Sequence, residues 1–459
     1  MTETLKTRIS DWIQAEKDSL IRDLMDLVNI ESVSQPDCTE PPFGPGCQKA
    51  LAWMLAKGRS LGFSGCNYDG YAGSLSLNGE EKDHPEEVTG IWCHLDVVPA
   101  GEGWQTPPFE AVYRDGLITG RGSQDNKASA ILGLYVLKAL RELGISLKHP
   151  AVLYFGLNEE CGMKDVDYFL SHFSAPGLSL IADCGFPACY GEKGTYSIRL
   201  TSREKTSYEI SDLQAGVAHN IIPESASMKL HISGNTHEIH VKGRAGHSAF
   251  PKGSVNAISL LLQEVRNLTE IPTNDKDNLL PFCQLAASTD GSPAGISFPD
   301  ELLSDLTCCA TSLSWEKGFW SLGLDIRYPH SMDPRELTDR LTRYANQQGY
   351  SISIESHLPS FGFSPDHPVI LKLTDVYNRE TGAEAKAYAM AGGTYAAKLP
   401  NAIPFGISFP DKRAIYQAFP NGHGDYHQPD ESVIADQILQ ALSIYLLALV
   451  EIDEINPRK

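Results

Sequence analysis

The sequence predicts an α/β protein in which a domain with a mostly parallel sheet is interrupted by an inserted α+β domain. In the first part of the chain, short continuous apolar runs alternate with helical patterns, as in a parallel sheet buried on both faces. After about Lys193, apolar and polar residues alternate as in half-exposed strands. Since 459 residues exceed a comfortable single core, two domains are expected. We assign residues 1–193 and 366–459 to the first domain and residues 194–365 to the insertion.

The elements of the first domain follow from the spacing of their apolar residues. Residues 4–29 and 126–143 carry apolar side chains at helical intervals. Pro, Gly and polar residues from Ser32 to Gly46 indicate a loop. The predicted elements, in order, are helices 4–29 and 48–61, strand 88–94, helix 126–143, and strands 150–156 and 178–182. Strands that alternate with helices in this way predict a parallel sheet.

The insertion and the end of the chain combine strand and helix patterns. Alternation of apolar and polar residues predicts strands at 197–200, 227–232, 238–242 and about 315–328. Helices are predicted at 255–268, from near Asp333 onward, at 369–379 and at 432–450. Strands with interspersed helices make the insertion an α+β domain.

Composition excludes several kinds of partner. A formal net charge of −20 argues against nucleic acid and anionic membranes, which require basic patches. No run approaches the roughly 18 apolar residues of a membrane span, and the first residues lack the apolar core of a signal peptide. The ten cysteines show no paired spacing, so we expect reduced thiols in a cytoplasmic protein.

Acidic and imidazole side chains follow several of the predicted strands. The set is His94, Asp96, Asp125, Glu159, Glu160 and Asp183, with one further histidine near the C-terminus. Open α/β sheets bind their ligands at the carboxyl ends of the strands, where these residues are expected to meet. Imidazole with several carboxylates is a set that holds divalent metal ions and leaves positions open. The pattern therefore indicates a two-metal hydrolase.

Each of these signals also has an ordinary explanation. His94 and Asp96 could be a solvated polar pair at a strand end, and Asp125 could simply cap a helix. The C-terminal histidine is ambiguous, because His427 and His423 lie in the same loop and spacing does not separate them. The hypothesis depends on the combination of residues and their order.

Four blocks of sequence resemble the di-zinc exopeptidases related to aminoacylase, carboxypeptidase G and succinyl-diaminopimelate desuccinylase. The blocks are His94-Leu-Asp-Val-Val-Pro-Ala-Gly, Gly120-Arg-Gly-Ser-Gln-Asp-Asn-Lys, Asn158-Glu-Glu and His427-Gln-Pro-Asp-Glu. The resemblance covers essentially the whole chain, in the same order and spacing. Within that family, the long insertion and the sequences around Asn220, His247 and Arg327 are similar to the bacterial PepV-type dipeptidases.

The resemblance implies a role for each residue of the site. It implies metal ligands His94, Asp125, Glu160, Asp183 and His427, catalytic residues Glu159, Asp96 and His247, and substrate-binding residues Asn220, Arg327, Gly393 and Thr394. Asp125 would bridge two metal ions. His94 and Asp183 would complete one metal site, and Glu160 and His427 the other.

The remaining residues would carry out the reaction. Glu159 would be the general base and acid, and Asp96 would orient His94. His247, from an inserted domain that acts as a lid, would stabilise the oxyanion. Arg327 would bind the substrate carboxylate. Without the resemblance, His247 would be interpreted as a surface histidine and Arg327 as a salt-bridge partner.

These assignments predict a metallopeptidase that hydrolyses dipeptides. The alternatives are a deacylase or carboxypeptidase acting on N-acyl amino acids and, in another class, an inert metal-binding homologue. The two ions are expected to be zinc, with manganese or cobalt as alternatives, because imidazole and carboxylate ligands suit all three. A monomer is expected because the long insertion could replace a second subunit, with a homodimer as the alternative.

Overall fold

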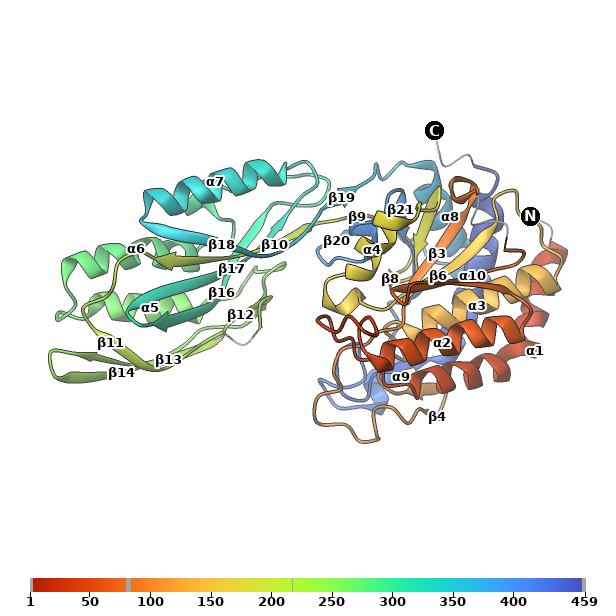
Figure 1. The fold of residues 1–459 in the computed structure, drawn as a ribbon, viewed down its shortest axis with the longest axis horizontal. Coiled ribbons are helices and arrows are strands. Elements are labelled where there is room, and N and C mark those ends of the chain that lie inside the picture. The colour runs from red at the N-terminus through yellow and green to blue at the C-terminus, as the bar shows by residue number, and fades with distance from the viewer. Residues whose placement is uncertain (1–2, 80–83, 217, 456–459) are drawn as a thin grey trace. The chain divides into compact units, whose positions relative to one another are not determined.

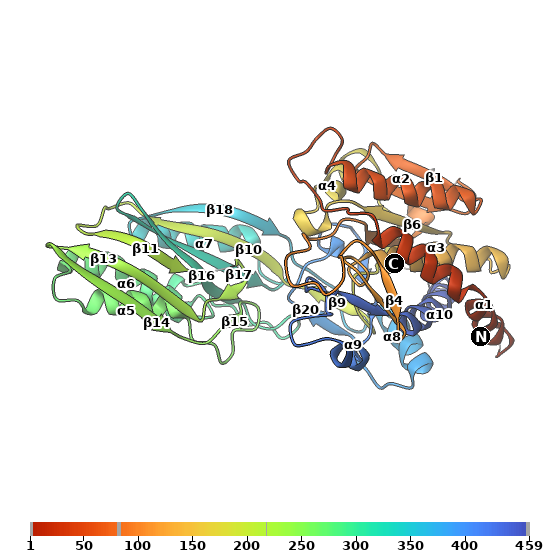
Figure 2. The same cartoon turned by 90° about the horizontal axis from the view of Figure 1, so that it is seen from below.

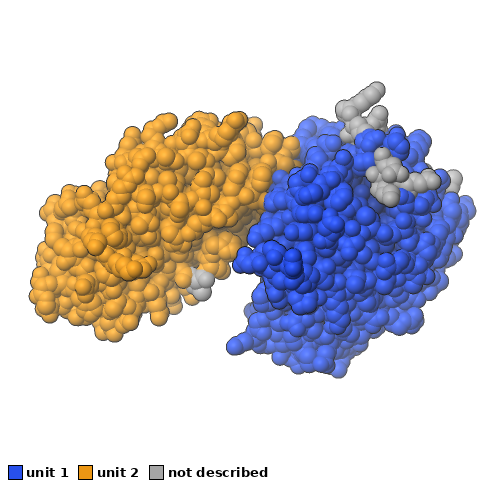
Figure 3. Space-filling model, in the orientation of Figure 1, with its two compact units in different colours: residues 1–190, 363–388, 394–459 blue, residues 191–362, 389–393 orange. Residues whose placement is uncertain are grey.

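The chain divides into two compact units. The computed structural model describes residues 3–79, 84–216 and 218–455. Unit 1 comprises Met1–Tyr190, Phe363–Tyr388 and Thr394–Lys459, and unit 2 comprises Gly191–Gly362 and Ala389–Gly393 (Figure 3). Unit 2 therefore interrupts unit 1 in the sequence. It also includes the short segment Ala389–Gly393, which the sequence prediction assigned to the first domain.

A six-stranded sheet forms the centre of unit 1. Its strand order is β1-β2-β6-β3-β7-β21, with bounds β1 Ser64–Tyr68, β2 Ala72–Ser76, β3 Thr89–His94, β6 Ala151–Gly156, β7 Leu178–Ile181 and β21 Ala402–Pro404. The four strands from β6 to β21 are parallel, and β1 and β2 add an antiparallel edge. The prediction of an α/β fold is thus confirmed, and this sheet is mostly parallel.

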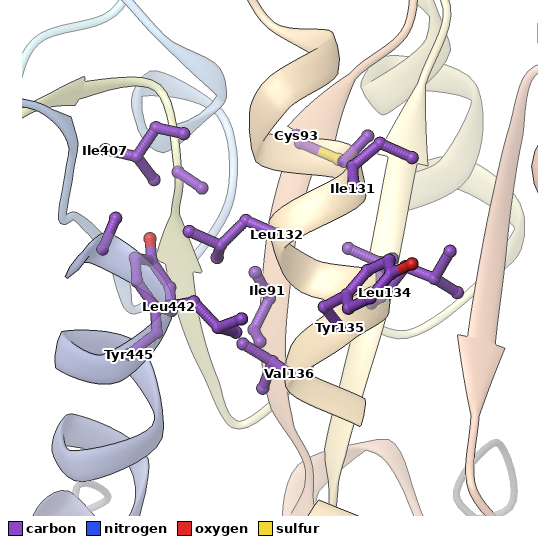
Figure 4. Packing of buried hydrophobic residues seen from close by; sticks show 14 of the residues in the cluster. Ile91, Cys93, Ile131, Leu132, Leu134, Tyr135, Val136, Ile407, Leu442 and Tyr445 are labelled. Atoms are coloured by element: carbon purple, nitrogen blue, oxygen red, sulfur yellow. The ribbon is translucent and has the colours of Figure 1, made fainter. Parts of the chain in front are cut away.

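Helices pack on both faces of this sheet. The helices of unit 1 are α1 Glu3–Val28, α2 Pro45–Ser60, α3 Lys127–Glu142, α4 Lys164–His172, α8 Pro368–Thr381, α9 Arg413–Ala418 and α10 Ala435–Ile452. Helices α1, α3 and α10 lie beside one another (Figures 1 and 2). Figure 4 shows Ile131 and Leu132 of α3 near Ile91 and Cys93 of β3, and all four side chains are fully buried. This packing explains the continuous helical pattern at 126–143.

Aromatic side chains cover the face opposite α3. Trp92 alternates with Ile91 and Cys93 along β3 and stacks on Tyr154 of β6, with ring centroids 4.6 Å apart. Phe169 of α4 packs edge-on against Trp92 at 5.2 Å. Because β3 is apolar on both sides, its sequence is a continuous hydrophobic run rather than an alternating one.

Contrary to the expectation from sequence, helix α10 is long and apolar enough to cross a membrane by length and composition alone. Its 18 residues have a mean hydropathy of 1.4, and 67% of that window is buried inside the protein. The helix packs on α1, α3 and α8. Burial of this kind is expected of a core helix in a globular unit, and a single apolar helix is weak evidence for a membrane.

The C-terminal prediction needs one correction. Residues 432–450 were predicted as a single helix, but β23 (Ser432–Ile434) precedes α10. This strand pairs with β5 (Leu117–Thr119), which also pairs with β4 (Val112–Arg114). The pairing partner is distant in sequence, so helical spacing alone did not reveal the strand.

Short strands form two further small sheets, the second of them mostly from residues of unit 2. Strand β8 (Cys184–Gly185) pairs with β22 (Ile407–Ser408). Strands β9 (Cys189–Glu192), β19 (Phe361–Gly362) and β20 (Tyr388–Met390) form a three-stranded sheet. All ten cysteines lie among the described residues and are free thiols, as expected.

Unit 2 has a separate core and an α+β composition. Its largest sheet has the order β16-β17-β10-β18 and a second has the order β11-β13-β14. The strands are β10 Gly194–Ser202, β11 Glu209–Ala215, β12 Ile221–Ile222, β13 Ser225–Ile232, β14 Asn235–Lys242, β15 Gly246–His247, β16 Thr307–Glu316, β17 Phe319–Tyr328 and β18 Tyr350–Leu358, and the helices are α5 Ala257–Asn267, α6 Thr273–Ala287 and α7 Pro334–Gln347. The predicted strand region at 315–328 spans the turn between β16 and β17.

Tight contact between α3 and the sheet yields a test of the fold. A Cβ atom at Gly133 would lie 2.4 Å from Cδ1 of the buried Leu153 on β6. We predict that Gly133→Ala lowers the free energy of unfolding, because overpacking costs about 1–3 kcal/mol and outweighs the ~1 kcal/mol that alanine gains in helix propensity. Adding Leu153→Val should restore part of the loss. Urea unfolding of both variants measures this, and a single variant more stable than the wild type would contradict the contact.

Candidate metal centre

The parallel strands bring the predicted ligands to one edge of the sheet. Strand β3 ends at His94, and Trp92 lies opposite Tyr154 of β6 and Ile181 of β7 in the register. The segments that follow these three strands therefore emerge side by side. The segment after β6 forms a short 3-10 turn, Glu159–Cys161, and the segment after β7 carries Asp183.

Asp125 lies between the two predicted ligand pairs. His94 Nε2 is 3.0 Å from Asp125 Oδ1 and 3.7 Å from Asp183 Oδ2. His427 Nε2 is 3.2 Å from Asp125 Oδ2 and 3.0 Å from Glu160 Oε1. The Asp125 carboxylate thus presents one oxygen to each imidazole, which is the arrangement expected of a group shared by two cations.

The donor set fits divalent metal ions. Ligand atoms of His94, Glu159 and Asp183 lie within 4.8 Å of one another, and so do those of His94, Asp125 and Glu160. Nitrogen and carboxylate oxygen atoms suit zinc, manganese and cobalt, whereas closed structural zinc sites favour cysteine. The residues present are therefore chemically suited to two divalent ions with open positions.

The negative charge of the cluster is poorly compensated. Burial raises the pKa of Asp183 to about 7, and the charges of Asp125 and Glu160 act in the same direction. Burial also raises the pKa of Glu159 well above its usual value, reinforced by the charge of Asp183. Hydrogen bonds to Asp125 and Glu160 raise the pKa of His427 to about 10. The cluster therefore favours bound positive charge, as protons or as cations.

Asp96 acts on both His94 and the glutamate turn. His94 Nδ1 is 2.9 Å from the main-chain carbonyl oxygen of Asp96 and 3.4 Å from its Oδ1. The Asp96 carboxylate accepts the N–H groups of Glu159 and Glu160, at 3.1 Å each. The sequence predicts that Asp96 orients His94. The Asp96 atom nearer to the His94 ring nitrogen is the main-chain carbonyl oxygen, and the carboxylate lies farther away. The carboxylate itself holds the turn that carries both glutamates.

The geometry distinguishes the two C-terminal histidines that spacing left open. His427 lies against Glu160 and Asp125, as described above. His423 Nδ1 is instead 2.7 Å from Oδ2 of the buried Asp430. His427 is therefore the histidine placed to bind a metal ion, and Asp430 engages His423.

Asn126 is a site residue that the sequence analysis missed. Its Oδ1 accepts the N–H of His94 at 3.3 Å, and its Nδ2 donates to Asp183 Oδ1 at 2.8 Å and to the Ala182 carbonyl at 2.9 Å. One amide thus links two predicted ligands of the same ion. Asn126 belongs to the Gly120–Lys127 block that carries the family resemblance, but no role was assigned to it from the sequence.

A buried ion pair, also missed, joins three loops of the site. Arg121 Nη1 donates to Glu431 Oε2 at 2.6 Å, and both side chains are about 1% exposed. Glu431 Oε1 accepts the N–H groups of Gln124 and Asp125, at 2.9 and 3.0 Å. Arg121 also donates to carbonyl oxygens of Pro99, Ala100 and Gln428. The pair therefore connects the loops that follow His94, precede α3 and carry His427.

The predicted residues of the insertion form a cluster of their own within unit 2. Asn220 Nδ2 and His247 Nε2 are 3.5 Å apart. Ser248, which follows His247, donates to Oδ2 of the fully buried Asp325, and Arg327 Nε donates to the same oxygen at 2.9 Å. The structure thus brings Asn220, His247 and Arg327 together. Their contact with a substrate stays a prediction.

The last two predicted substrate residues lie next to each other in the chain. Gly393 ends the segment of unit 2, where an added Cβ would lie 2.1 Å from Leu358 Cδ2. Thr394 begins the last part of unit 1, and its side chain caps a 3-10 turn by accepting the N–H of Ala396 at 3.2 Å. Their role in substrate binding also stays a prediction.

The two histidine environments yield a direct test. We predict that His427→Ala lowers the metal content of the purified protein from two ions to one, since it removes a ligand of the site shared with Glu160. His423→Ala is the matched control and should retain both ions, because its ring is engaged by Asp430. Metal analysis after dialysis measures both variants. A loss in His423→Ala with full occupancy in His427→Ala would reverse the assignment.

Comparison with known proteins agrees with this geometry. The model of "Peptidase family M20/M25/M40" matches residues 90–451. A protein of Staphylococcus epidermidis named "Putative dipeptidase" is 28% identical, over 94% of this chain and 97% of its own length. A dipeptidase structure from Saccharomyces cerevisiae shares the fold with a TM-score of 0.61 at 14% identity, covering 98% of this chain and 99% of that one.

A second solved structure also shares the fold. It is a Bacillus subtilis protein described as a dinuclear metal binding peptidase of the M20 family, with a TM-score of 0.51, 13% identity, and coverage of 96% of this chain and 99% of that one. At this identity the likeness shows the fold alone. The family match covers more than half of the chain, and the chain therefore belongs to peptidase family M20/M25/M40 and is a hydrolase that acts on peptide bonds.

Proposed function

We propose that this peptidase is a dipeptidase that requires two divalent metal ions. The observation that carries the proposal is the Asp125 carboxylate, with one oxygen directed to His94 and the other to His427. His94 and Asp183 would hold one ion, and Glu160 and His427 the other. Zinc is the proposed metal, and manganese or cobalt would satisfy the same ligands.

Glu159 is the proposed general base. Ions bound in such a site polarise a carbonyl group and acidify water. The Glu159 carboxylate lies within 4.8 Å of ligand atoms of His94 and Asp183, and Asp96 fixes its main-chain N–H. Glu159 is thus placed to accept a proton from the attacking water and to pass it to the leaving amine.

His247 and Arg327 of unit 2 are proposed to contact the substrate, together with Asn220, Gly393 and Thr394. His247 carries a neutral imidazole that can donate a hydrogen bond to an oxyanion, and burial lowers its pKa, helped by the charge of Arg327. Arg327 is the proposed partner of the substrate carboxylate. Its Nε is bound to Asp325 and its Nη1 to Thr195 and the Ala391 carbonyl, which would hold the guanidinium in one orientation.

The choice of a dipeptide substrate is supported by the relatives. Several proteins that match about 95% of this chain have names that begin "Putative dipeptidase". A deacylase acting on N-acyl amino acids is the second candidate, because it would use the same ions and the same base. An inert homologue is the third, and the presence of Glu159 argues against it, since loss of the base is a simple route to inactivity.

Replacing the base separates catalysis from metal binding. We predict that Glu159→Gln lowers kcat by about 10²–10⁴-fold, since glutamine is similar in shape but cannot accept the proton. The variant should retain two metal ions, whereas Glu160→Gln should lose occupancy. Steady-state kinetics and metal analysis measure the two effects. An active Glu159→Gln enzyme would exclude Glu159 as the base.

A substrate panel tests the proposed function. Metal-stripped enzyme, restored with zinc or manganese, should hydrolyse dipeptides with a free amine faster than the matched N-acetyl amino acids. Release of free amino acids measures both. Preference for the acylated compounds would identify a deacylase. Absence of turnover on either class, in enzyme shown to contain metal, would support the inert homologue.

A further inference from the structure

Two buried carboxylates hold the turn that carries the proposed base. Residues 157–160 contribute four successive N–H groups. The first two donate to Asp165 Oδ2, at 2.7 and 2.9 Å, and the last two donate to Asp96, at 3.1 Å each. Both carboxylates are fully buried. The main-chain conformation that directs the Glu159 and Glu160 side chains is therefore fixed by a hydrogen bond at each of the four residues.

Asp165 also has a partner from a distant part of unit 1. It lies at the start of α4, where its Oδ1 accepts the N–H of Val166 at 2.8 Å. The hydroxyl of Tyr395 donates to Asp165 Oδ2, the same oxygen that holds the turn. Tyr395 is 1% exposed and directly follows Thr394, a predicted substrate residue. The hydroxyl thus connects the base turn to the segment that carries Thr394.

Glycine at position 156 makes room for this pair. A Cβ atom there would lie 2.0 Å from the Tyr395 hydroxyl oxygen and 2.3 Å from Asp165 Oδ2. Gly156 ends β6 and lies opposite His94 in the register. The rings of His94 and Tyr395 are also close, with centroids 6.5 Å apart. The tyrosine therefore packs over the end of the strand, next to a predicted metal ligand.

We propose that Tyr395 and Asp165 are a positioning pair for the peptidase reaction. Neither is expected to touch the substrate or a metal ion. The pair fixes the turn at 157–160, so that the Glu159 carboxylate is held where the proton is transferred. This step matters because misplacement of a catalytic group by about 1 Å can cost 10²-fold in rate. The inference rests on the proposed function only in taking Glu159 as the base.

The test is Tyr395→Phe in the full-length, metal-loaded enzyme. The variant keeps the ring and its packing and removes only the hydroxyl. We expect kcat to fall roughly 10–100-fold while KM stays unchanged. Enzyme saturated with metal should keep both ions, since Glu160 is the one proposed ligand on this turn and four other residues also hold the ions. Amide hydrogen exchange in the peptide containing residues 157–160 should become faster, in both metal-free and metal-loaded protein.

Tyr135→Phe is the matched control. Tyr135 is also a buried tyrosine, and its hydroxyl donates to the buried carboxylate of Asp23 at 3.0 Å, joining α3 to α1. Both substitutions remove one buried hydroxyl from one carboxylate, so their urea midpoints should shift by similar amounts. Only Tyr395→Phe should change kcat and the exchange at 157–160. This comparison separates positioning from a general loss of stability.

The outcomes distinguish this inference from the proposed function. An unchanged kcat in Tyr395→Phe, or an equal fall in Tyr135→Phe, overturns the positioning role. If the wild-type enzyme hydrolyses no member of the substrate panel, the proposed function fails and hydrogen exchange alone decides the inference. In that case, faster exchange at 157–160 in Tyr395→Phe would show that the pair holds the turn in place. Unchanged exchange would overturn the inference.

Discussion

Carboxylates crowded at one edge of a parallel sheet are the constraint on which the rest of unit 1 depends. Like charges at this distance repel, and burial disfavours each charged form, as the raised pKa values of Glu159 and Asp183 show. The protein opposes this repulsion with main-chain N–H groups, two imidazoles and the Asn126 amide. The cluster therefore favours added positive charge, as protons or as metal ions.

The sheet supplies the rigidity that such a centre needs. Strand β3 is enclosed by α3 on one face and by Trp92, Tyr154 and Phe169 on the other. Its end therefore cannot shift without repacking both layers. Strands β6 and β7 run parallel to β3, so the segments that follow all three strands lie at the same edge of the sheet. The site is thus placed by a well-packed scaffold, while its chemistry lies in short loops.

Local pattern predicted the elements of the core but not the contacts between distant segments. The continuous apolar runs identified β3, β6 and β7, and hence the residues that follow them. Helix α6 was missed because Pro281 lies inside it and lowers the apparent helical tendency. Arg121 and Glu431 are 310 residues apart, and Asp165 and Tyr395 are 230 apart. No spacing rule connects such pairs, so only the folded structure reveals them.

The two distant pairs support different parts of the site. Arg121 and Glu431 hold the loop of Asp125 to the loop of His427, so they support two of the proposed metal ligands. Asp165 and Tyr395 hold the turn of Glu159, so they support the proposed general base. Glu160 belongs to the same turn as Glu159, and its side chain lies against His427. Both pairs therefore influence the position of this proposed ligand. Metal affinity and turnover should therefore be separable except at Glu160, because the loops of Asp125 and His427 are joined by Glu431, whereas the base turn is held by Asp96 and Asp165.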